Sequence, residues 1–499
     1  MVTITAPFRP ALTLTHAAAC FLAAYGVYLA LPFFIYPEYS IFYREYGFHG
    51  CPTLSRLLWD YNPLHGDNFF RPTAGTLIPW LLQADLMEPR TIVFANSMFM
   101  GLLAFLVPTL FLPGTGLASR LLASAVILGA PAVMDSYVFS YPDATYLIFS
   151  ALFVFFFMRA HWAENPVGVN YWIAVVLFTL ALTSKEIGVF CVFVVFMLAV
   201  MEQGELRSVR WKRLIAQLAP FALMSVAFYL YMLTRFAIGG EDYAITPGLE
   251  RLGRAVYMFA FLSNVKFPVS WNSYASWATL GYSIIGTLAW AALWLYGLFV
   301  LWRNRTRYTL WQYVGAGLLM AVLLVAFGVL GGSTHHVFPV LVIAAALAGK
   351  LWQDHQDRMD SNRGFALQSA MLCIILLGMY GGQLVTASNL LTKWRLHEAY
   401  DYNTRLFQDE RLHAVSIRDD THILVKICLD KWVTGCFVGV RSYLGRAGKF
   451  GSEEYIEPGT YDADMLQRAV SEHPDKDIWL LECRFAKDPP YVFRKVWPE

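Results

Sequence analysis

Three carboxylates between residues 37 and 90 have surroundings that suit acid–base chemistry. Glu38 follows directly after a long apolar run, and Asp60 and Asp67 flank a turn that contains proline and glycine. A carboxylate beside apolar surface is desolvated, which raises its pKa and fits it to act as a general base near neutral pH. The competing interpretation is an amphipathic loop resting on lipid headgroups, with its charges solvated. The density of carboxylates and aromatic residues in the segment favours function.

Four further side chains are suited to contact an anionic group, because they lie where apolar runs begin or end. They are Arg71, Lys185, His335 and His336. Arg71 precedes a proline where the chain returns to an apolar run, and Lys185 lies in "TSKEIG" between two short apolar segments. The histidines follow a Gly-Gly break in "GGSTHHVFP". Ionisable groups at membrane depth or at helix ends are costly, so they are functional candidates.

Each of these groups also has a structural interpretation. Lys185 and Glu186 could pair with each other or extend to the membrane surface. Asp143, in "SYPDATYL", is most simply a helix N-cap. The two histidines could bind a metal or hydrogen-bond backbone groups near Pro339, but adjacent side chains point in different directions and make a poor metal pair. We favour anion contact for the histidines and leave the role of Lys185 open.

The composition indicates what positions these residues. The 499-residue chain is 57% hydrophobic and 15% charged, whereas soluble domains carry about 25% charged residues. Apolar runs of 18 or more residues recur, which is typical of a polytopic membrane protein. A formal net charge of +2 argues against a nucleic-acid partner. The seven cysteines form no CxxC pair, so neither metal-ligand spacing nor a disulfide framework is supported.

The apolar runs predict about eleven membrane-spanning helices, within a range of eleven to thirteen. The predicted spans are 11–36, 91–113, 119–134, 144–160, 170–183, 187–201, 214–234, 278–302, 308–330, 336–352 and 364–387. Thirteen Lys and Arg residues lie in short connections on one side: Arg9, Arg120, Arg159, Arg207, Arg210, Lys212, Arg213, Arg303, Arg305, Arg307, Lys350, Arg358 and Arg363. This bias predicts a cytoplasmic N-terminus, with the 37–90 loop and the C-terminal tail outside.

The fold class predicted is therefore a mainly α, polytopic membrane protein with a small extracytoplasmic α/β domain. We expect a transmembrane domain at 1–389, including the 37–90 loop, and an α/β domain at 390–499. In the tail, "THILVKICL" and "DIWLLECRF" predict buried strands, and "DADMLQRAV" predicts a helix. The Asp462-Ala463-Asp464 pattern fits the start of that helix better than a metal–nucleotide site. We interpret Asp354, Asp357 and Asp360 as parts of a solvated connector.

The ordered set of polar features resembles the GT-C membrane glycosyltransferases, especially the protein O-mannosyltransferase-like and aminoarabinose-transferase-like branches. The similar passages are "FFRPTAGTLIPWLLQADLMEPRTIVFANSMF", "SYPDATYL", "LTSKEIGVF" and "HHVFP", over about residues 1–350. In those branches an aspartate usually occupies the early acidic position, where this chain has Glu38, so Asp60 and Asp67 remain alternative bases. Histidine also stands where arginine is usual in "HHVFP". Asn96 lies within the second predicted span.

The resemblance implies an inverting transfer from a polyprenyl-phosphate-linked sugar to an acceptor hydroxyl on the outer side of the membrane. We expect the inner membrane of a bacterium, with a periplasmic site, because the single N-x-S/T sequon, Asn304-Arg305-Thr306, lies on the predicted inner side. A carboxylate among Glu38, Asp60 and Asp67 would be the base. Arg71, Lys185, His335 and His336 would hold the donor phosphate, with Asp143 and Glu186 in support. The expected partners are membrane lipid, the lipid-linked donor and a glycan, lipid or protein acceptor. No cofactor is specified, and the need for a divalent cation is left open. The alternatives are a lipid-linked glycan polymerase or ligase, and a transporter or flippase.

Overall fold

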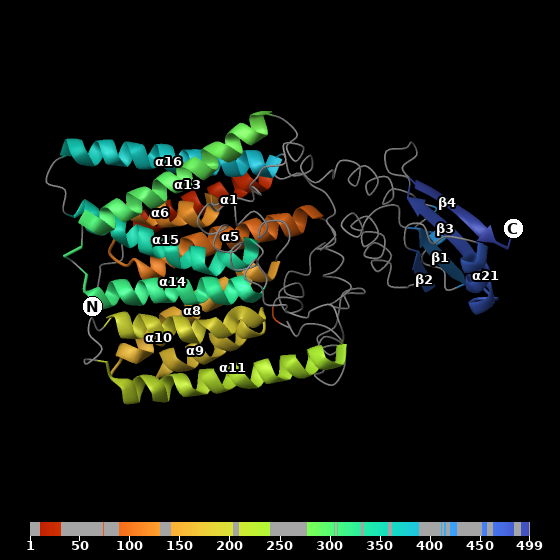
Figure 1. Cartoon of the computed structure of the whole chain (residues 1–499), viewed down its shortest axis with the longest axis horizontal. Coiled ribbons are helices and arrows are strands. Elements are labelled where there is room, and N and C mark those ends of the chain that lie inside the picture. The colour runs from red at the N-terminus through yellow and green to blue at the C-terminus, as the bar shows by residue number, and fades with distance from the viewer. Residues whose placement is uncertain are drawn as a thin grey trace. The chain divides into compact units, whose positions relative to one another are not determined.

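The computed structural model divides the chain into two compact units (Figure 1). The helical unit comprises Met1–Leu31, Phe70–Ala74 and Val93–Asn389, and the second unit comprises Pro32–Phe69, Gly75–Ile92 and Leu390–Glu499. We describe α5 with the helical unit, and we call the part of the second unit from residue 390 onward the C-terminal unit. In the helical unit, the structure describes residues 10–30, 73, 89–129, 141–202, 209–239, 277–303, 305–306, 308–330, 334–357 and 362–388. In the C-terminal unit it describes residues 411, 414–415, 420–426, 452–456, 463–483 and 491–498. The domain boundaries predicted above stay a prediction.

Every apolar run predicted to span the membrane contains a helix. The helices are α1 (Pro10–Ala30), α5 (Pro89–Phe111), α6 (Leu117–Gly129), α8 (Tyr141–Trp162), α9 (Val169–Leu182), α10 (Phe190–Glu202), α11 (Trp211–Gly239), α13 (Trp277–Arg303), α14 (Leu310–Leu330), α15 (Thr334–Gln356) and α16 (Asn362–Ser388). Helices satisfy every backbone polar group internally, as a membrane requires. By length and composition, α1, α5, α8 and α11 are long and apolar enough to span a membrane. The total number of spans stays a prediction.

Neighbouring helices in the unit pack side by side, with α8 against α9, α6 against α15, and α13 against α16 (Figure 1). The rings of Phe153, Phe178 and Phe221 join α8, α9 and α11, with centroid separations of 5.0 to 5.3 Å. Successive helices run in opposite directions, so the helix termini gather at two opposite ends of the unit. We name the end with the starts of α8, α10 and α15 the Lys185 end. The opposite end, where α6 and α11 begin, is the Arg120 end.

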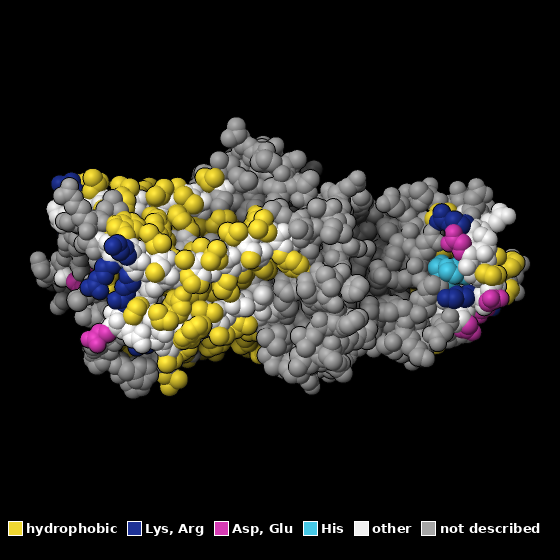
Figure 2. Space-filling model, turned by 90° about the horizontal axis from the view of Figure 1, so that it is seen from below, with side chains coloured by type: hydrophobic (Ala, Val, Ile, Leu, Met, Phe, Trp, Pro, Cys, Tyr) yellow, Lys and Arg dark blue, Asp and Glu magenta, His cyan; other side chains and the backbone are white. Residues whose placement is uncertain are grey.

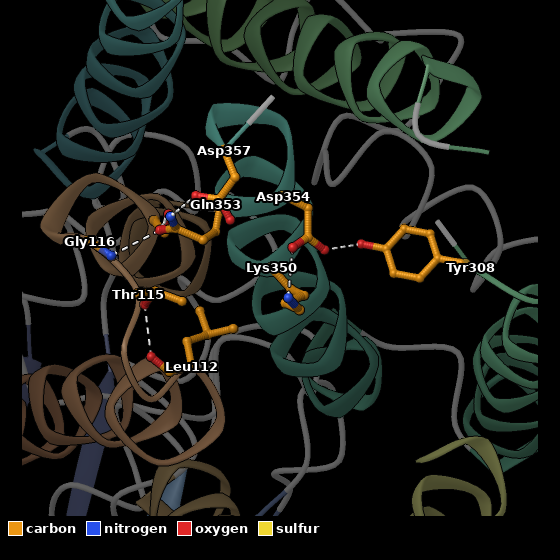
Figure 3. A network of polar contacts seen from close by, with 9 residues as sticks. Leu112, Thr115, Gly116, Tyr308, Lys350, Gln353, Asp354 and Asp357 are labelled. Atoms are coloured by element: carbon orange, nitrogen blue, oxygen red, sulfur yellow. Dashed lines mark hydrogen bonds and ion pairs between the residues drawn. The ribbon is translucent and has the colours of Figure 1, made fainter. Parts of the chain in front are cut away.

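Polar contacts tie the helices together at the Arg120 end (Figure 3). Lys350 Nζ lies 2.7 Å from Asp354 Oδ1 within α15, and the Tyr308 hydroxyl, just before α14, donates to the other Asp354 oxygen. The interpretation of Asp354 as part of a solvated connector is wrong, because the residue lies in α15 and its side chain is fully buried. A buried carboxylate needs such partners to offset its lost hydration.

The outer surface of the helical unit is apolar along most of its described length. Figure 2 shows a broad hydrophobic surface with Lys and Arg side chains gathered at one end. On α11, for example, Leu223, Val226 and Leu230 are all exposed. An apolar exterior of this extent is expected of a membrane protein, whose helices face lipid instead of water.

The C-terminal unit contains a four-stranded sheet in the order β2-β1-β3-β4. The strands β1 (Thr421–Lys426), β2 (Ser452–Ile456) and β3 (Asp477–Cys483) are parallel, and β4 (Tyr491–Trp497) is antiparallel to β3. Helix α21 (Ala463–Glu472) packs on the sheet through a core that includes Leu424, Ala469, Ile478 and Leu480.

The α/β prediction for the tail is confirmed in its main elements. The segments predicted as strands contain β1 and β3, and the predicted helix is α21. The sequence analysis missed β2 and β4, whose sequences "SEEYI" and "YVFRKVW" carry charges inside short edge strands. Edge strands face solvent on one side, so their apolar pattern is weaker than that of the central pair.

The close approach of α6 and α15 gives a test of the helix packing. A Cβ added at Gly349 would lie 2.6 Å from Leu112 Cδ1 and 2.8 Å from the Ser119 carbonyl oxygen. We therefore expect Gly349→Ala to destabilise the protein by about 1–3 kcal/mol, because backbone cannot move aside. Gly317→Ala is the matched control, since nothing lies within 4 Å of an added Cβ there. Thermal unfolding in detergent measures both, and equal melting temperatures would contradict the packing.

Candidate functional site

The "TSKEIG" passage forms the turn between α9 and α10. Thr183, at the C-cap of α9, donates its hydroxyl to the Thr179 carbonyl at 2.6 Å, and the Ser184 hydroxyl donates to the Leu180 carbonyl at 2.6 Å. The Thr179 carbonyl also accepts from the Thr183 N–H at 2.9 Å, so the hydroxyl bonds of Thr183 and Ser184 reinforce the last turn of α9. Lys185 then takes an extended conformation, φ −156° and ψ 137°, and the chain enters a short 3₁₀ helix, η3 (Glu186–Val189).

Lys185 is buried at this turn, with 3% of its surface exposed. Its ammonium nitrogen lies 5.8 Å from the centroid of the Tyr146 ring on α8, a separation at which a cation is attracted to an aromatic face. Tyr146 is itself 2% exposed. The possibility that Lys185 simply extends to the membrane surface is therefore excluded, because an extended lysine keeps its ammonium group in water.

Gly188 makes the tight turn sterically feasible. A Cβ at this position would lie 2.9 Å from the Ala181 carbonyl oxygen and 3.1 Å from the Leu182 Cα atom. Both neighbours are backbone atoms of α9, so they cannot rotate away as a side chain could. The Gly188 N–H donates to the Lys185 carbonyl at 2.9 Å. Glycine at this position therefore holds η3 against α9 and fixes the backbone that carries Lys185.

Thr73 connects this turn to the segment that contains the predicted Arg71-Pro72 passage. The Thr73 N–H donates to the Thr183 carbonyl at 3.1 Å, and the two threonine hydroxyl oxygens are 2.6 Å apart. Because the Thr183 hydroxyl donates to Thr179, the Thr73 hydroxyl is the donor in this pair. Thr73 is 4% exposed, so the contact is shielded from solvent. We name this two-bond contact the threonine clasp.

The other predicted site residues fall into two groups. Glu38, Asp60, Asp67 and Arg71 lie outside the described residues. For Asp143, Glu186, His335 and His336 the structure describes the backbone alone. Asp143 is the third residue of α8, so it lies inside the first helical turn and not at the N-cap position predicted from the sequence. His335 and His336 lie in the first turn of α15, and Glu186 begins η3.

The helical unit therefore places the described candidates at its Lys185 end. The starts of α8 and α15 and the α9–η3–α10 turn share that end, and α8 contacts both η3 and α15. Asn96 is buried in the first half of α5, at 1% exposure. A carboxylate or anion near a helix start is stabilised by the helix dipole. The roles of all these residues stay predictions.

The sequence analysis missed three residues of this site: Thr73, Tyr146 and Thr183. None is charged, and the clasp joins residues that are 110 positions apart, so no local pattern indicates it. Among the described residues, no group of three or more His, Cys, Asp or Glu side chains could hold a metal ion.

Comparison with solved structures identifies the fold. The chain is similar to ArnT from Cupriavidus metallidurans in the apo state, with 13% identity over 97% of each chain and a TM-score of 0.51. It is also similar to the apo oligosaccharyltransferase of Archaeoglobus fulgidus, with 12% identity over 94% of this chain and 69% of that chain, and a TM-score of 0.51. Both are membrane proteins of the GT-C superfamily, and the likeness at this identity establishes a shared fold.

The comparisons by sequence add no relative. No protein-family model matches the chain, and no curated protein matches it. The similarity to GT-C proteins is therefore carried by the arrangement of the helices, which agrees with the resemblance of the ordered polar motifs.

The threonine clasp gives a test by double-mutant cycle. We expect Thr73→Val and Thr183→Val each to lower the free energy of unfolding by about 0.5–1.5 kcal/mol, with the double variant losing less than the sum. Thermal or denaturant unfolding in detergent measures the three variants. Thr179→Val is the control, because the exposed Thr179 hydroxyl bonds only its own helix, at the Val175 carbonyl. Strictly additive losses at Thr73 and Thr183 would show that the clasp does not form.

Proposed function

We propose that this chain, a membrane protein with the GT-C fold, is a glycosyltransferase that moves a sugar from a polyprenyl-phosphate-linked donor to an acceptor hydroxyl. The observation that carries the proposal is the buried Lys185, held on a rigid turn at the end of a GT-C helical unit. A cation withdrawn from water interacts strongly with a phosphate, because the local dielectric is low.

The threonine clasp supports a joint phosphate site for Arg71 and Lys185. Arg71 precedes Thr73 by two residues, so the intervening chain can span no more than about 7 Å. Thr73 is fixed to Thr183, which is in turn two residues from Lys185. Chain connectivity therefore limits how far Arg71 can lie from the Lys185 turn. Two cations at one site would stabilise the charge that develops on the departing lipid phosphate.

The reaction we propose is a displacement with inversion. The acceptor oxygen bonds to the anomeric carbon as the bond from that carbon to the phosphate oxygen breaks, and polyprenyl phosphate leaves with both electrons. A carboxylate among Glu38, Asp60 and Asp67 takes the acceptor proton, and His335, His336, Asp143 and Glu186 stay candidates for supporting contacts. General-base help contributes about 10²–10⁴-fold, and positioning both substrates contributes on the order of 7–11 kcal/mol.

The charge distribution supports an extracytoplasmic location for the Lys185 end. Among the described residues, the Arg120 end carries Arg120, Arg159, Arg210, Lys212, Arg213, Arg303, Arg305, Lys350 and Arg363, and the Lys185 end carries Arg90, Lys185 and Arg235. Basic residues accumulate on the cytoplasmic side of membrane proteins. The donor must then be lipid-linked, since sugar nucleotides are absent outside the cytoplasmic membrane.

Replacing Lys185 tests the phosphate site. We expect Lys185→Met to raise the KM for the lipid-linked donor at least tenfold, with a smaller change for the acceptor, because one charge-assisted contact is worth about 1.5–3 kcal/mol. The assay is release of polyprenyl phosphate from a panel of polyprenyl-phosphate pentoses and hexoses. Lys212→Met is the control, since Lys212 is exposed at the Arg120 end. An equal loss for donor and acceptor would assign Lys185 a structural role.

Replacing the carboxylates separately identifies the base. Among Glu38→Gln, Asp60→Asn and Asp67→Asn, we expect one variant to lose about 10²–10⁴-fold in kcat while its melting temperature and donor binding stay near those of the parent protein. The measurement is single-turnover transfer by folded, purified protein in lipid. Full activity in all three variants would exclude a base in this loop. Release of no polyprenyl phosphate by the parent protein from any donor would contradict the proposed function itself.

A further inference from the structure

Arg120 is a buried arginine far from the candidate site. It lies in the first turn of α6, at the Arg120 end of the helical unit, and 8% of its surface is exposed. Its Nε nitrogen is fully buried and has no hydrogen-bond partner among the described residues. A guanidinium group stays charged in proteins, so burying its Nε–H donor without an acceptor is costly.

The acidic residues of the neighbouring helix are used by other partners (Figure 3). On α15, Asp354 is bound by Lys350 and Tyr308, and Asp357 accepts from the Gln353 side-chain amide at 2.8 Å. The Gln353 carbonyl oxygen accepts from the Gly116 N–H at 2.9 Å and the Ser119 hydroxyl at 3.0 Å. Gln353 therefore occupies the start of α6, and no described carboxylate forms an ion pair with Arg120.

A second polar group without a full set of partners lies beside Arg120. His16 on α1 is fully buried, and its Nε2 lies 2.8 Å from the Ser124 hydroxyl oxygen on α6. Ser124 donates its single hydroxyl hydrogen to the carbonyls of Ala104 and Arg120, at 2.8 and 2.9 Å, so Nε2 is the donor to Ser124. In the neutral ring the lone pair is then on Nδ1, which is buried with no partner among the described residues.

The two groups require complementary chemistry from one ligand. Arg120 requires an anion whose oxygens accept two parallel hydrogen bonds from the guanidinium group, and phosphate is well suited to this. His16 Nδ1 requires an O–H donor. His16 contacts Ser124, which lies one helical turn after Arg120 on the same face of α6, so the two groups lie in the same region of the unit. Phosphatidylglycerol offers a phosphate and neighbouring hydroxyls, and hydrogen phosphate offers a P–OH group. Basic pockets between membrane helices on the cytoplasmic side are suited to anionic headgroups.

We propose that Arg120 and His16 form a binding site for a hydroxyl-bearing phosphate, separate from the Lys185 end. The phosphate comes from the headgroup of a phosphatidylglycerol-type lipid or from free phosphate. Arg120 binds the phosphate oxygens, and His16 accepts a hydrogen bond from the ligand hydroxyl. Because α1, α5 and α6 meet at this point, through His16, the Ala104 carbonyl and Ser124, the bound ligand stabilises the contact of the first three described helices. This site does not depend on the proposed transfer reaction.

The test compares ligands and variants in the full-length protein. Native mass spectrometry of purified protein in detergent measures retention of phosphatidylglycerol against phosphatidylcholine, in phosphate-free buffer. We expect the parent protein to prefer phosphatidylglycerol, and Arg120→Gln to lower its retention by roughly five- to tenfold. Arg120→Lys keeps the charge but loses the fork, so we expect an intermediate loss, and it serves where Arg120→Gln does not fold. A separate thermal-unfolding measurement adds inorganic phosphate without lipid.

The controls separate a specific site from general surface charge. Lys212→Gln removes an exposed cation at the same end and should leave retention unchanged. Protection by inorganic phosphate alone, abolished in Arg120→Gln and reduced in Arg120→Lys, would support the site and identify free phosphate as the source. Equal retention of the two lipids by the parent protein, with no protection by inorganic phosphate, overturns the proposal. An equal loss in Lys212→Gln and in the Arg120 variants also overturns it.

Discussion

The burial of Lys185 constrains the geometry of the whole Lys185 end. An ammonium group with 3% of its residue surface exposed must be held by groups that cannot drift, because each lost contact leaves a charge in an apolar medium. The turn provides this rigidity through the hydroxyl bonds of Thr183 and Ser184 to the last carbonyls of α9. Gly188 allows η3 to lie against α9, and the Tyr146 ring faces the ammonium group from α8. Three helices are therefore fixed relative to one charge.

The same physics acts at the Arg120 end with different partners. There, buried polar side chains form pairs between helices, such as His161 Nδ1 with Gln217 Oε1 at 2.8 Å and His355 Nε2 with Gln368 Oε1 at 2.6 Å. These pairs join α8 to α11 and α15 to α16. Both ends thus have polar anchors, while the middle of the unit is packed by aromatic and aliphatic side chains, as the Phe153 contacts show. A rigid scaffold with polar ends suits a site built on one of them.

The helices could be predicted from the sequence because lipid offers the backbone N–H and C=O groups no hydrogen-bond partners. An apolar run of the right length must be helical, so each predicted range contains a helix. The two central strands β1 and β3 were found for a similar reason, since they are continuous apolar runs. By contrast, the clasp between Thr73 and Thr183 and the contact of Tyr308 with Asp354 join residues 110 and 46 positions apart. Such pairs depend on which helices become neighbours, and a single sequence does not encode that locally.

Asp354 and Arg120 illustrate why charged residues were harder to interpret than apolar ones. Both lie where a helix begins or ends, and both were assigned to short connections, where charges are usually solvated. The structure buries both, but with opposite consequences. Asp354 forms an ion pair with Lys350 and accepts a hydrogen bond from Tyr308, so its charge is compensated within the described fold. Arg120 receives no carboxylate from the same neighbouring helix, because Gln353 occupies the start of α6. Among the described residues no carboxylate pairs with Arg120, so the phosphate site proposed above would supply the negative charge, and the cytoplasmic leaflet predicted at this end is rich in anionic lipids.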